Sequence, residues 1–149
     1  MHTIVVGVDG SEGSKRALEW AAVEARLRNG RLKLVYAWRP PADLYGGPGW
    51  AGVDGETISE LRLFAERRLR QASAELSASL EGLEVERLVI EDAAAGALIA
   101  AAADAELLVV GTRGHGGFAG LLLGSVSQQC AQHSPCPVVI VPAHRETHA

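Results

Sequence analysis

Short apolar runs alternate along the chain with longer segments whose apolar residues recur at helical spacing. The runs are TIVVGV, LKLVYAW, EVERLVI, ELLVVG and PVVIV, and glycine, proline or a charged residue borders each of them. Such β-branched runs are typical of strands buried on both faces of a sheet, although the charges within EVERLVI indicate an edge strand. The intervening segments have the period of helices. The pattern predicts the order β-α-β-α-β-α-β-α-β.

Start and stop signals place the four expected helices. Thr57 and Glu60 have the spacing of a capping box, and the Asn-Gly pair at 29–30 is typical of a helix C-terminus. The stretch from Arg39 to Glu56 is rich in proline and glycine, which predicts a long loop, either a lid, a partner surface or a disordered segment. The helices are expected over Ser11 or Ser14 to Arg28, Thr57 to Gly82, Ala93 to Asp104 and Gly124 to Gln132.

Alternating strands and helices define the expected fold class. Helical crossovers between strands imply a parallel sheet with helices on both faces, so we expect an α/β fold: a single doubly wound, Rossmann-like domain spanning residues 1–149. The common strand orders for such a sheet are 2-1-3-4-5 and 3-2-1-4-5. We favour 3-2-1-4-5, because it brings the turn GVDGS after the first strand and the turn GTRG after the fourth to one crevice.

Composition narrows the classes of function and location. The 149 residues are 48% hydrophobic and 21% charged, as in ordinary globular domains, and the net charge of −4 offers no basic surface for nucleic acid. No apolar run reaches the roughly 18 residues of a membrane span. The N-terminus lacks a basic region and Asp9 interrupts its apolar run, so no signal peptide is expected and the cytoplasm is the expected location.

The two cysteines are expected to be reduced. Cys130 and Cys136 lie in one helix-to-strand corner, where a disulfide would close a loop too small to stabilise the fold much. Together with His133 they have a spacing that suggests zinc, but a fourth ligand at metal-site spacing is missing. We therefore expect no metal site here.

The densest polar signal is the glycine-rich stretch GTRGHGGFAGLLLGSVSQQ, residues 111–129. Glycines let main-chain N–H groups approach a ligand, and a helix that starts near Gly124 adds unpaired N–H groups and a partial positive charge, a combination that suits phosphate. Arg113 could supply charge and the hydroxyls of Ser125 and Ser127 further donors.

A plainer interpretation is equally open from this pattern alone. The glycines could simply end a strand and loosen a loop, while Ser125 caps its own helix. The spacing matches neither the dinucleotide motif GxGxxG nor the Walker motif GxxxxGK[ST]. Neither of those standard nucleotide sites is therefore expected.

The chain resembles the universal stress proteins, in their ATP-binding branch. That branch carries glycine, two residues, glycine, nine residues, glycine and then serine or threonine, which here are Gly111, Gly114, Gly124 and Ser125. The segments VGVDGSEGSKRALEWAA, ADAELLVVGTRGHGG and SPCPVVIV are also similar to the family, and the likeness covers essentially the whole chain. The resemblance implies a protein that binds ATP, which Mg²⁺ can accompany, and that takes part in a stress response.

The resemblance also implies which residues would bind the nucleotide. Asp9 could contact the ribose or a metal on the phosphates, although an aspartate there is also a routine turn residue. Asp92 stands where the family often has glycine, and its charge would oppose phosphate. The implied contacts are Gly7, Val8, Asp9 and Ala37 to adenine and ribose, Gly111, Arg113 and Gly114 to ribose and phosphates, and Gly124, Ser125, Val126 and Ser127 to the phosphate chain.

Three functions stay open at this point. The first is an ATP-dependent regulator with negligible turnover, because His115 has no evident orienting partner and no other general base stands beside the phosphate loop. The second is a slow ATPase or adenylyl-transfer enzyme, and the third is a dimeric interaction module without a ligand. The apolar strand Val138 to Val141 is expected at the sheet edge, and the resemblance implies a homodimer through it.

Overall fold

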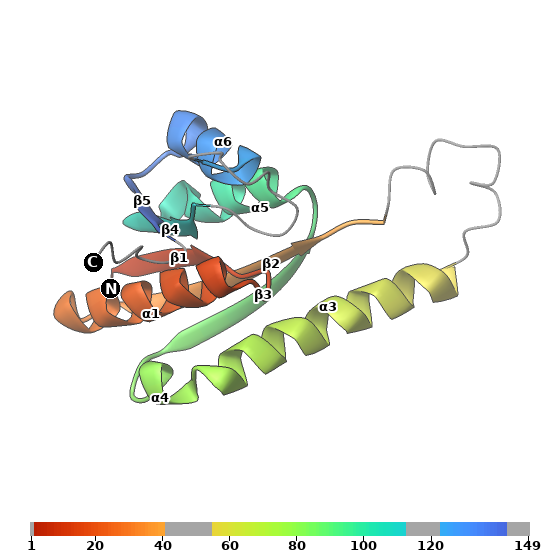
Figure 1. The fold of residues 1–149 in the computed structure, drawn as a ribbon, viewed down its shortest axis with the longest axis horizontal. Coiled ribbons are helices and arrows are strands. Elements are labelled where there is room, and N and C mark those ends of the chain that lie inside the picture. The colour runs from red at the N-terminus through yellow and green to blue at the C-terminus, as the bar shows by residue number, and fades with distance from the viewer. Residues whose placement is uncertain (1, 41–54, 113–122, 143–149) are drawn as a thin grey trace, which may run out of the picture.

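The computed structural model describes residues 2–40, 55–112 and 123–142. Five parallel strands form one sheet in the order β3-β2-β1-β4-β5, which confirms the predicted order (Figure 1). The strands are β1 (Thr3–Gly7), β2 (Arg31–Trp38), β3 (Val85–Glu91), β4 (Leu107–Gly111) and β5 (Val138–Val141). The helices are α1 (Glu12–Leu27), α3 (Gly55–Glu75), α4 (Ser77–Leu80), α5 (Ala94–Ala101) and α6 (Ser125–His133), with a 3₁₀ turn, η2 (Ala102–Asp104), after α5.

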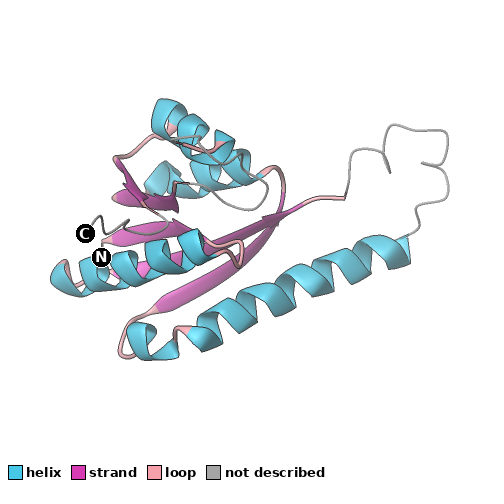
Figure 2. Cartoon of the chain, in the orientation of Figure 1, coloured by secondary structure: helices cyan, strands magenta, loops and turns pink. Residues whose placement is uncertain are grey.

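The helices cover both faces of the sheet. Figure 2 shows α1, α3 and α4 on one face and α5 with α6 on the other. The expected α/β class and the doubly wound arrangement are therefore confirmed. None of the helices in the described ranges has an apolar stretch long enough to cross a bilayer.

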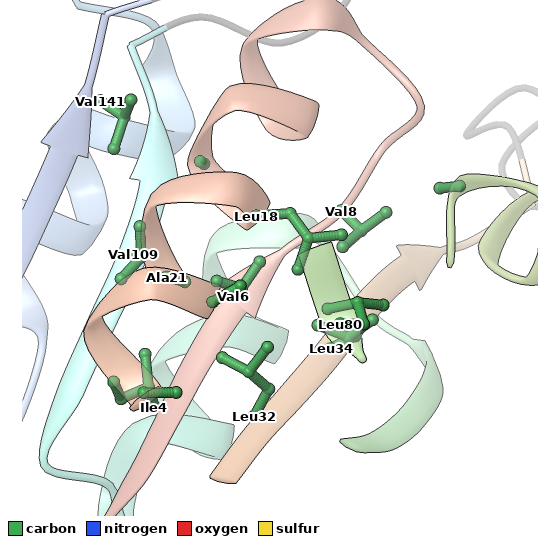
Figure 3. Close-up of a cluster of buried hydrophobic side chains, with 14 of the residues drawn as sticks. Ile4, Val6, Val8, Leu18, Ala21, Leu32, Leu34, Leu80, Val109 and Val141 are labelled. Atoms are coloured by element: carbon green, nitrogen blue, oxygen red, sulfur yellow. The ribbon is translucent and has the colours of Figure 1, made fainter. Parts of the chain in front are cut away.

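Hydrophobic residues form a separate cluster on each face. Successive residues of a strand point to opposite faces, so Ile4 and Val6 join the cluster beneath α1 (Figure 3), whereas Val5 joins the one beneath α5 and α6. The buried face of α1 is made mainly of small side chains, which lets this helix lie close to the sheet. Its fully buried alanines are Ala17, Ala21, Ala22 and Ala25.

Local signals set both ends of α1. Ser11 is its N-cap, and the Ser11 hydroxyl oxygen accepts from the Ser14 N–H at 3.2 Å. At the other end Asn29 takes a left-handed φ of 53°, and the Gly30 N–H donates to the Ala25 carbonyl at 2.8 Å. The expected stop at the Asn-Gly pair is confirmed, and of the two expected starts the structure has Ser11.

The helix expected from Thr57 to Gly82 differs in two ways. It already includes Gly55 and Glu56, so Thr57 lies inside α3 and the capping-box prediction was wrong. Glu56 places a negative charge in the first turn of α3, where it complements the helix dipole. The helix is also broken at Leu76, after which α4 carries Leu80 into the hydrophobic cluster beneath α1. Across the break, the Leu80 N–H still donates to the Leu76 carbonyl at 3.2 Å.

The substitution Leu108→Ala tests the packing of β4, an interior strand of the described sheet. Leu108 is 0% exposed in β4, so its truncation should lower the free energy of unfolding by about 2–5 kcal/mol. Val23→Ala is the control, because Val23 is 57% exposed on α1 and its loss should change the stability by less than about 0.5 kcal/mol. Urea unfolding followed by circular dichroism measures both. Equal midpoints for the two variants would contradict the assigned burial.

Candidate functional site

A cavity of about 350 Å³ opens at the carboxyl ends of β1 and β4. These strands are neighbours in the sheet, and the chain leaves β1 toward one edge and β4 toward the other, so their ends diverge and leave a hollow. The walls come from the turns after β1 and β4, the end of β2, and the first turns of α1, α5 and α6. Segments far apart in the sequence therefore meet in one place.

All the described residues that the sequence analysis assigned to binding line this cavity: Gly7, Val8, Asp9, Ala37, Gly111, Gly124, Ser125, Val126 and Ser127. The remaining two, Arg113 and Gly114, lie outside the described residues, as does His115. The convergence of the two glycine-bearing turns, which the favoured strand order required, is present in the structure.

The corner between β1 and α1 satisfies its own polar groups. The Asp9 carboxylate accepts from the Ser11 N–H at 2.9 Å and from the Ser11 hydroxyl at 2.5 Å. The Ser14 hydroxyl donates to the Ser11 carbonyl at 3.0 Å, and Gly10, between Asp9 and Ser11, takes a φ of 82°, which favours glycine. Asp9 therefore has the turn role that the sequence left open, and it also lies at the cavity wall.

The start of α6, unlike that of α1, has no side chain that accepts from its first-turn N–H groups. Gly124 is the N-cap and has no side chain, so no side-chain cap reaches the first turn. The first intrahelical donor is the Gln128 N–H, which bonds to the Gly124 carbonyl at 3.0 Å. By helix geometry the N–H groups of Ser125, Val126 and Ser127 have no intrahelical acceptor. This uncapped turn lines the cavity and carries the positive end of the helix dipole.

The Ser127 hydroxyl has a different role from the expected one. Its oxygen lies 2.8 Å from the Thr112 carbonyl oxygen and 3.0 Å from that of Gly124, and the residue is only 2% exposed. A hydroxyl has a single hydrogen, which here is donated to the main chain. The expectation that this hydroxyl donates to phosphate is therefore corrected, while the Ser127 main-chain N–H keeps its place in the first turn of α6.

Close backbone packing explains Gly111. A Cβ on Gly111 would lie 3.0 Å from both the carbonyl carbon and the carbonyl oxygen of Gly13 in α1, and a main-chain group cannot easily move aside. A Cβ on Gly7 would lie 3.0 Å from a terminal carbon of the Leu98 side chain in α5, which can shift. Bare backbone is therefore needed for helix packing at Gly111, whatever the cavity binds.

Asp92 does not line the cavity. Its carboxylate accepts from the Ala93 N–H at 2.7 Å, and its own N–H donates to the Trp38 carbonyl at 3.0 Å. The side chain is exposed at the start of α5, where a negative charge complements the helix dipole. The predicted repulsion between the Asp92 charge and a phosphate has no support from the position of this residue, because Ala94 and Leu98 of α5, and not Asp92, line the cavity.

Several wall residues were not expected from the sequence. Thr112 could have been noted because it directly follows Gly111, and Leu98 because it is a large apolar residue in the alanine-rich segment. Neither feature of the sequence shows that the residue lies at a cavity. The unexpected members of the wall are Ser11, Ser14, Val35, Tyr36, Ala94, Leu98, Val110 and Thr112.

The cysteines on and after α6 take no part in the cavity wall. Cys130 is fully buried, and burial raises the pKa of its thiol to about 11, so the thiol stays protonated at neutral pH. Cys136 is half-buried and also free. Among the residues that the structure describes, no group of three or more histidine, cysteine or acidic side chains is placed to hold a metal.

Sequence comparison connects the chain with one family. The sequence model of the Universal stress protein family matches residues 1–142. The chain is similar to a universal stress protein of Thermus aquaticus, with 36% identity over 141 residues that cover 93% of this chain and 97% of that protein. It is also 35% identical over 137 residues to the universal stress protein Rv2623 of Mycobacterium tuberculosis, covering 92% of this chain and 44% of Rv2623. The chain thus spans less than half the length of this relative.

Structure comparison agrees with the sequence. The fold is similar to a universal stress protein solved in complex with cAMP, at a TM-score of 0.68 and 32% identity, covering 96% of this chain and 98% of that one. It is also similar to the universal stress protein UspA of Lactobacillus plantarum, at a TM-score of 0.73 and 22% identity, with 94% and 97% covered. The second likeness concerns the fold alone.

The substitution Gly111→Ala tests the close approach of β4 to α1. The new methyl group would press on the Gly13 main chain, so the free energy of unfolding should fall by roughly 1–3 kcal/mol. Gly55→Ala is the matched control, because a Cβ there meets nothing within 4 Å and alanine favours the helix. Thermal unfolding compares the two. A Gly111→Ala variant as stable as the parent would show that the two backbones do not pack this closely.

Proposed function

This chain belongs to the universal stress protein family, and we propose that it binds an adenine nucleotide, ATP in the first place, in the cavity between β1 and β4. In this proposal the bound nucleotide biases the conformation or the partner choice of the protein, which acts as a regulator in a stress response. The observation that carries the proposal is the uncapped first turn of α6, which lines one end of a cavity whose other end is lined largely by aliphatic side chains.

The α6 end of the cavity suits the phosphates. Main-chain N–H groups of Ser125, Val126 and Ser127 and the positive end of the helix dipole together favour an anion at this point. The neighbouring Gly124 exposes backbone without a Cβ, and the Ser125 hydroxyl lies on the exposed side of the helix. A phosphate group there would accept hydrogen bonds from the first-turn N–H groups, because the N-cap Gly124 has no side chain to accept them.

The opposite part of the cavity suits a flat base. Its described walls are largely aliphatic, and a relative with 32% identity was solved with cAMP, an adenine nucleotide. A volume of about 350 Å³ lies within the range of small-molecule sites. The wall residues concerned are Val8, Val35, Ala37, Leu98 and Val110.

The described cavity wall favours binding over turnover. Asp9 is its only carboxylate among the described residues, and its Oδ1 accepts both hydrogen bonds from Ser11, which hold Asp9 in the turn after β1. A general base for hydrolysis would have to stand beside the phosphates at the α6 end of the cavity, where the described wall holds no carboxylate or histidine. In this proposal Asp9 shapes the nucleoside end, and Mg²⁺, if it accompanies ATP, is carried by the phosphates.

We also propose a homodimer through β5. This strand forms one edge of the described sheet, and Val138, Val139 and Ile140 are only partly buried there. An apolar edge offers unpaired main-chain groups to another strand, and a second copy of β5 running antiparallel would satisfy them around a two-fold axis.

The substitution Ser125→Asp tests the phosphate site with little risk to the fold. A carboxylate in the first turn of α6 complements the helix dipole, so stability should stay level or rise by about 0.5 kcal/mol. The same charge repels the phosphates, so the affinity for ATP should fall roughly tenfold, or about 1.4 kcal/mol. Isothermal titration calorimetry with ATP, with and without Mg²⁺, measures the affinity.

Ser77→Asp provides the matched control. Ser77 is exposed at the first position of α4, so the same change of charge at another helix start should leave ATP binding unaltered. Absence of ATP binding by the unmodified protein would refute the proposed function. Rapid Mg²⁺-dependent release of phosphate would instead favour the ATPase.

The substitution Ile140→Lys tests the dimer. A lysine on the partly buried edge strand should block pairing of two β5 strands and give a monomer in sedimentation equilibrium. Glu86→Lys is the control on β3, at the opposite edge of the sheet, where the exposed position should tolerate lysine without a change of mass. If the unmodified protein sediments as a monomer, the dimer proposal fails.

A further inference from the structure

We infer that Ser127 is a positioning residue: its hydroxyl holds the first turn of α6 in register with the end of β4, so that the free N–H groups of that turn face the phosphates. The inference rests on the proposed function, because it assigns the residue a role at the same site. It differs from direct contact with the ligand, since the hydroxyl hydrogen is already donated to main-chain oxygen.

The Thr112 peptide is the anchor point. Its carbonyl oxygen accepts from the Gly124 N–H at 2.7 Å and lies 2.8 Å from the Ser127 hydroxyl oxygen, the shorter of the two main-chain contacts of that hydroxyl. On the other side, the Thr112 N–H donates to the Val141 carbonyl of β5 at 3.0 Å. The peptide therefore belongs to the sheet, and whatever bonds to its carbonyl is fixed relative to the sheet.

Ser127 reaches this anchor from the third residue of α6. At 2% exposure its hydroxyl bond is shielded from water, where a lost hydrogen bond is costly. Without the hydroxyl, the described link between the start of α6 and Thr112 would be the Gly124 N–H alone. A single bond allows the helix start to pivot, and donors that are displaced by a fraction of an ångström bind phosphate less well.

The two serine-containing helix starts at the cavity show why this arrangement suits a binding site. In α1 the N-cap Ser11 accepts from the Ser14 N–H, so a first-turn donor is consumed inside the protein. In α6 the N-cap is Gly124, which has no side chain to accept from the first turn, whereas Ser127 donates to main-chain oxygen as Ser14 does at the same position of α1. The α6 arrangement secures the helix start and leaves its N–H groups for a ligand.

Three variants of the full-length chain separate hydrogen bonding from packing. Ser127→Ala removes the hydroxyl, Ser127→Cys retains most of the volume with a poor donor, and Ser127→Thr retains the donor. Ser73→Ala is the matched control, because Ser73 is also buried and donates to the Leu69 carbonyl at 2.9 Å, but in α3 and away from the cavity wall. Each variant is titrated with ATP and with adenosine, and its thermal midpoint is recorded.

We expect Ser127→Ala and Ser127→Cys to weaken ATP binding by roughly tenfold, the equivalent of one hydrogen bond, and adenosine binding by less than about twofold. Ser127→Thr should restore the ATP affinity. In the ligand-free protein, the Gly124 amide should exchange its hydrogen faster in Ser127→Ala and Ser127→Cys, but not in Ser127→Thr or Ser73→Ala. The exchange measurement does not depend on whether the nucleotide is ATP.

The other outcomes would overturn the inference. The Ser127 variants could lose affinity for ATP and for adenosine equally, in proportion to the fall of their thermal midpoints, as Ser73→Ala would. This result would mean that Ser127 only stabilises the fold. Full ATP affinity in Ser127→Ala would mean that the register of α6 does not depend on this bond. Unmodified protein that binds no ATP, yet shows the expected exchange at Gly124, would refute the proposed function while leaving the anchoring bond intact.

Discussion

The parallel pairing of β1 with β4 is the constraint on which the rest of the structure depends. It places Ile4 beside Leu107 and Val6 beside Val109, and the chain then departs from these two strands toward opposite edges of the sheet. Because helices follow both strands, the first turns of α1 and α6 meet above the carboxyl ends of β1 and β4. The cavity is the space that the two diverging connections leave between them.

Small residues allow the layers to approach closely enough for that cavity to form. Gly111 lies against the main chain of Gly13, and the buried face of α1 is made mainly of alanines. A larger residue at the end of β4 would push α1 outward and move the corner that carries Asp9. The first glycine of the glycine-rich stretch therefore serves packing, whereas Gly124 lines the cavity and belongs to the proposed phosphate site.

The starts of α1 and α6 both line the cavity, but they differ in how their main-chain N–H groups are satisfied. The β1–α1 corner is held by hydrogen bonds among Asp9, Ser11 and Ser14, and it forms the wall of the cavity that we assign to the nucleoside in the proposed function. The α6 start has no side-chain cap and is attached to β4 through Thr112. A helix start that is anchored but uncapped retains its partial positive charge for an anion.

The sequence by itself determined the alternation of strands and helices, because apolar runs and glycine turns are local signals, and the strand order was chosen so that two polar turns share one crevice. The binding residues came from the family resemblance, and those of them that the structure describes line the cavity. The sequence could not show that α3 begins at Gly55 and breaks at Leu76, that Asp92 lies outside the cavity wall, or that the Ser127 hydroxyl bonds to the main chain. Each of these depends on which distant segment lies beside the residue. Hydrogen-bond partners and burial are properties of that spatial neighbourhood, so only the tertiary structure decided them.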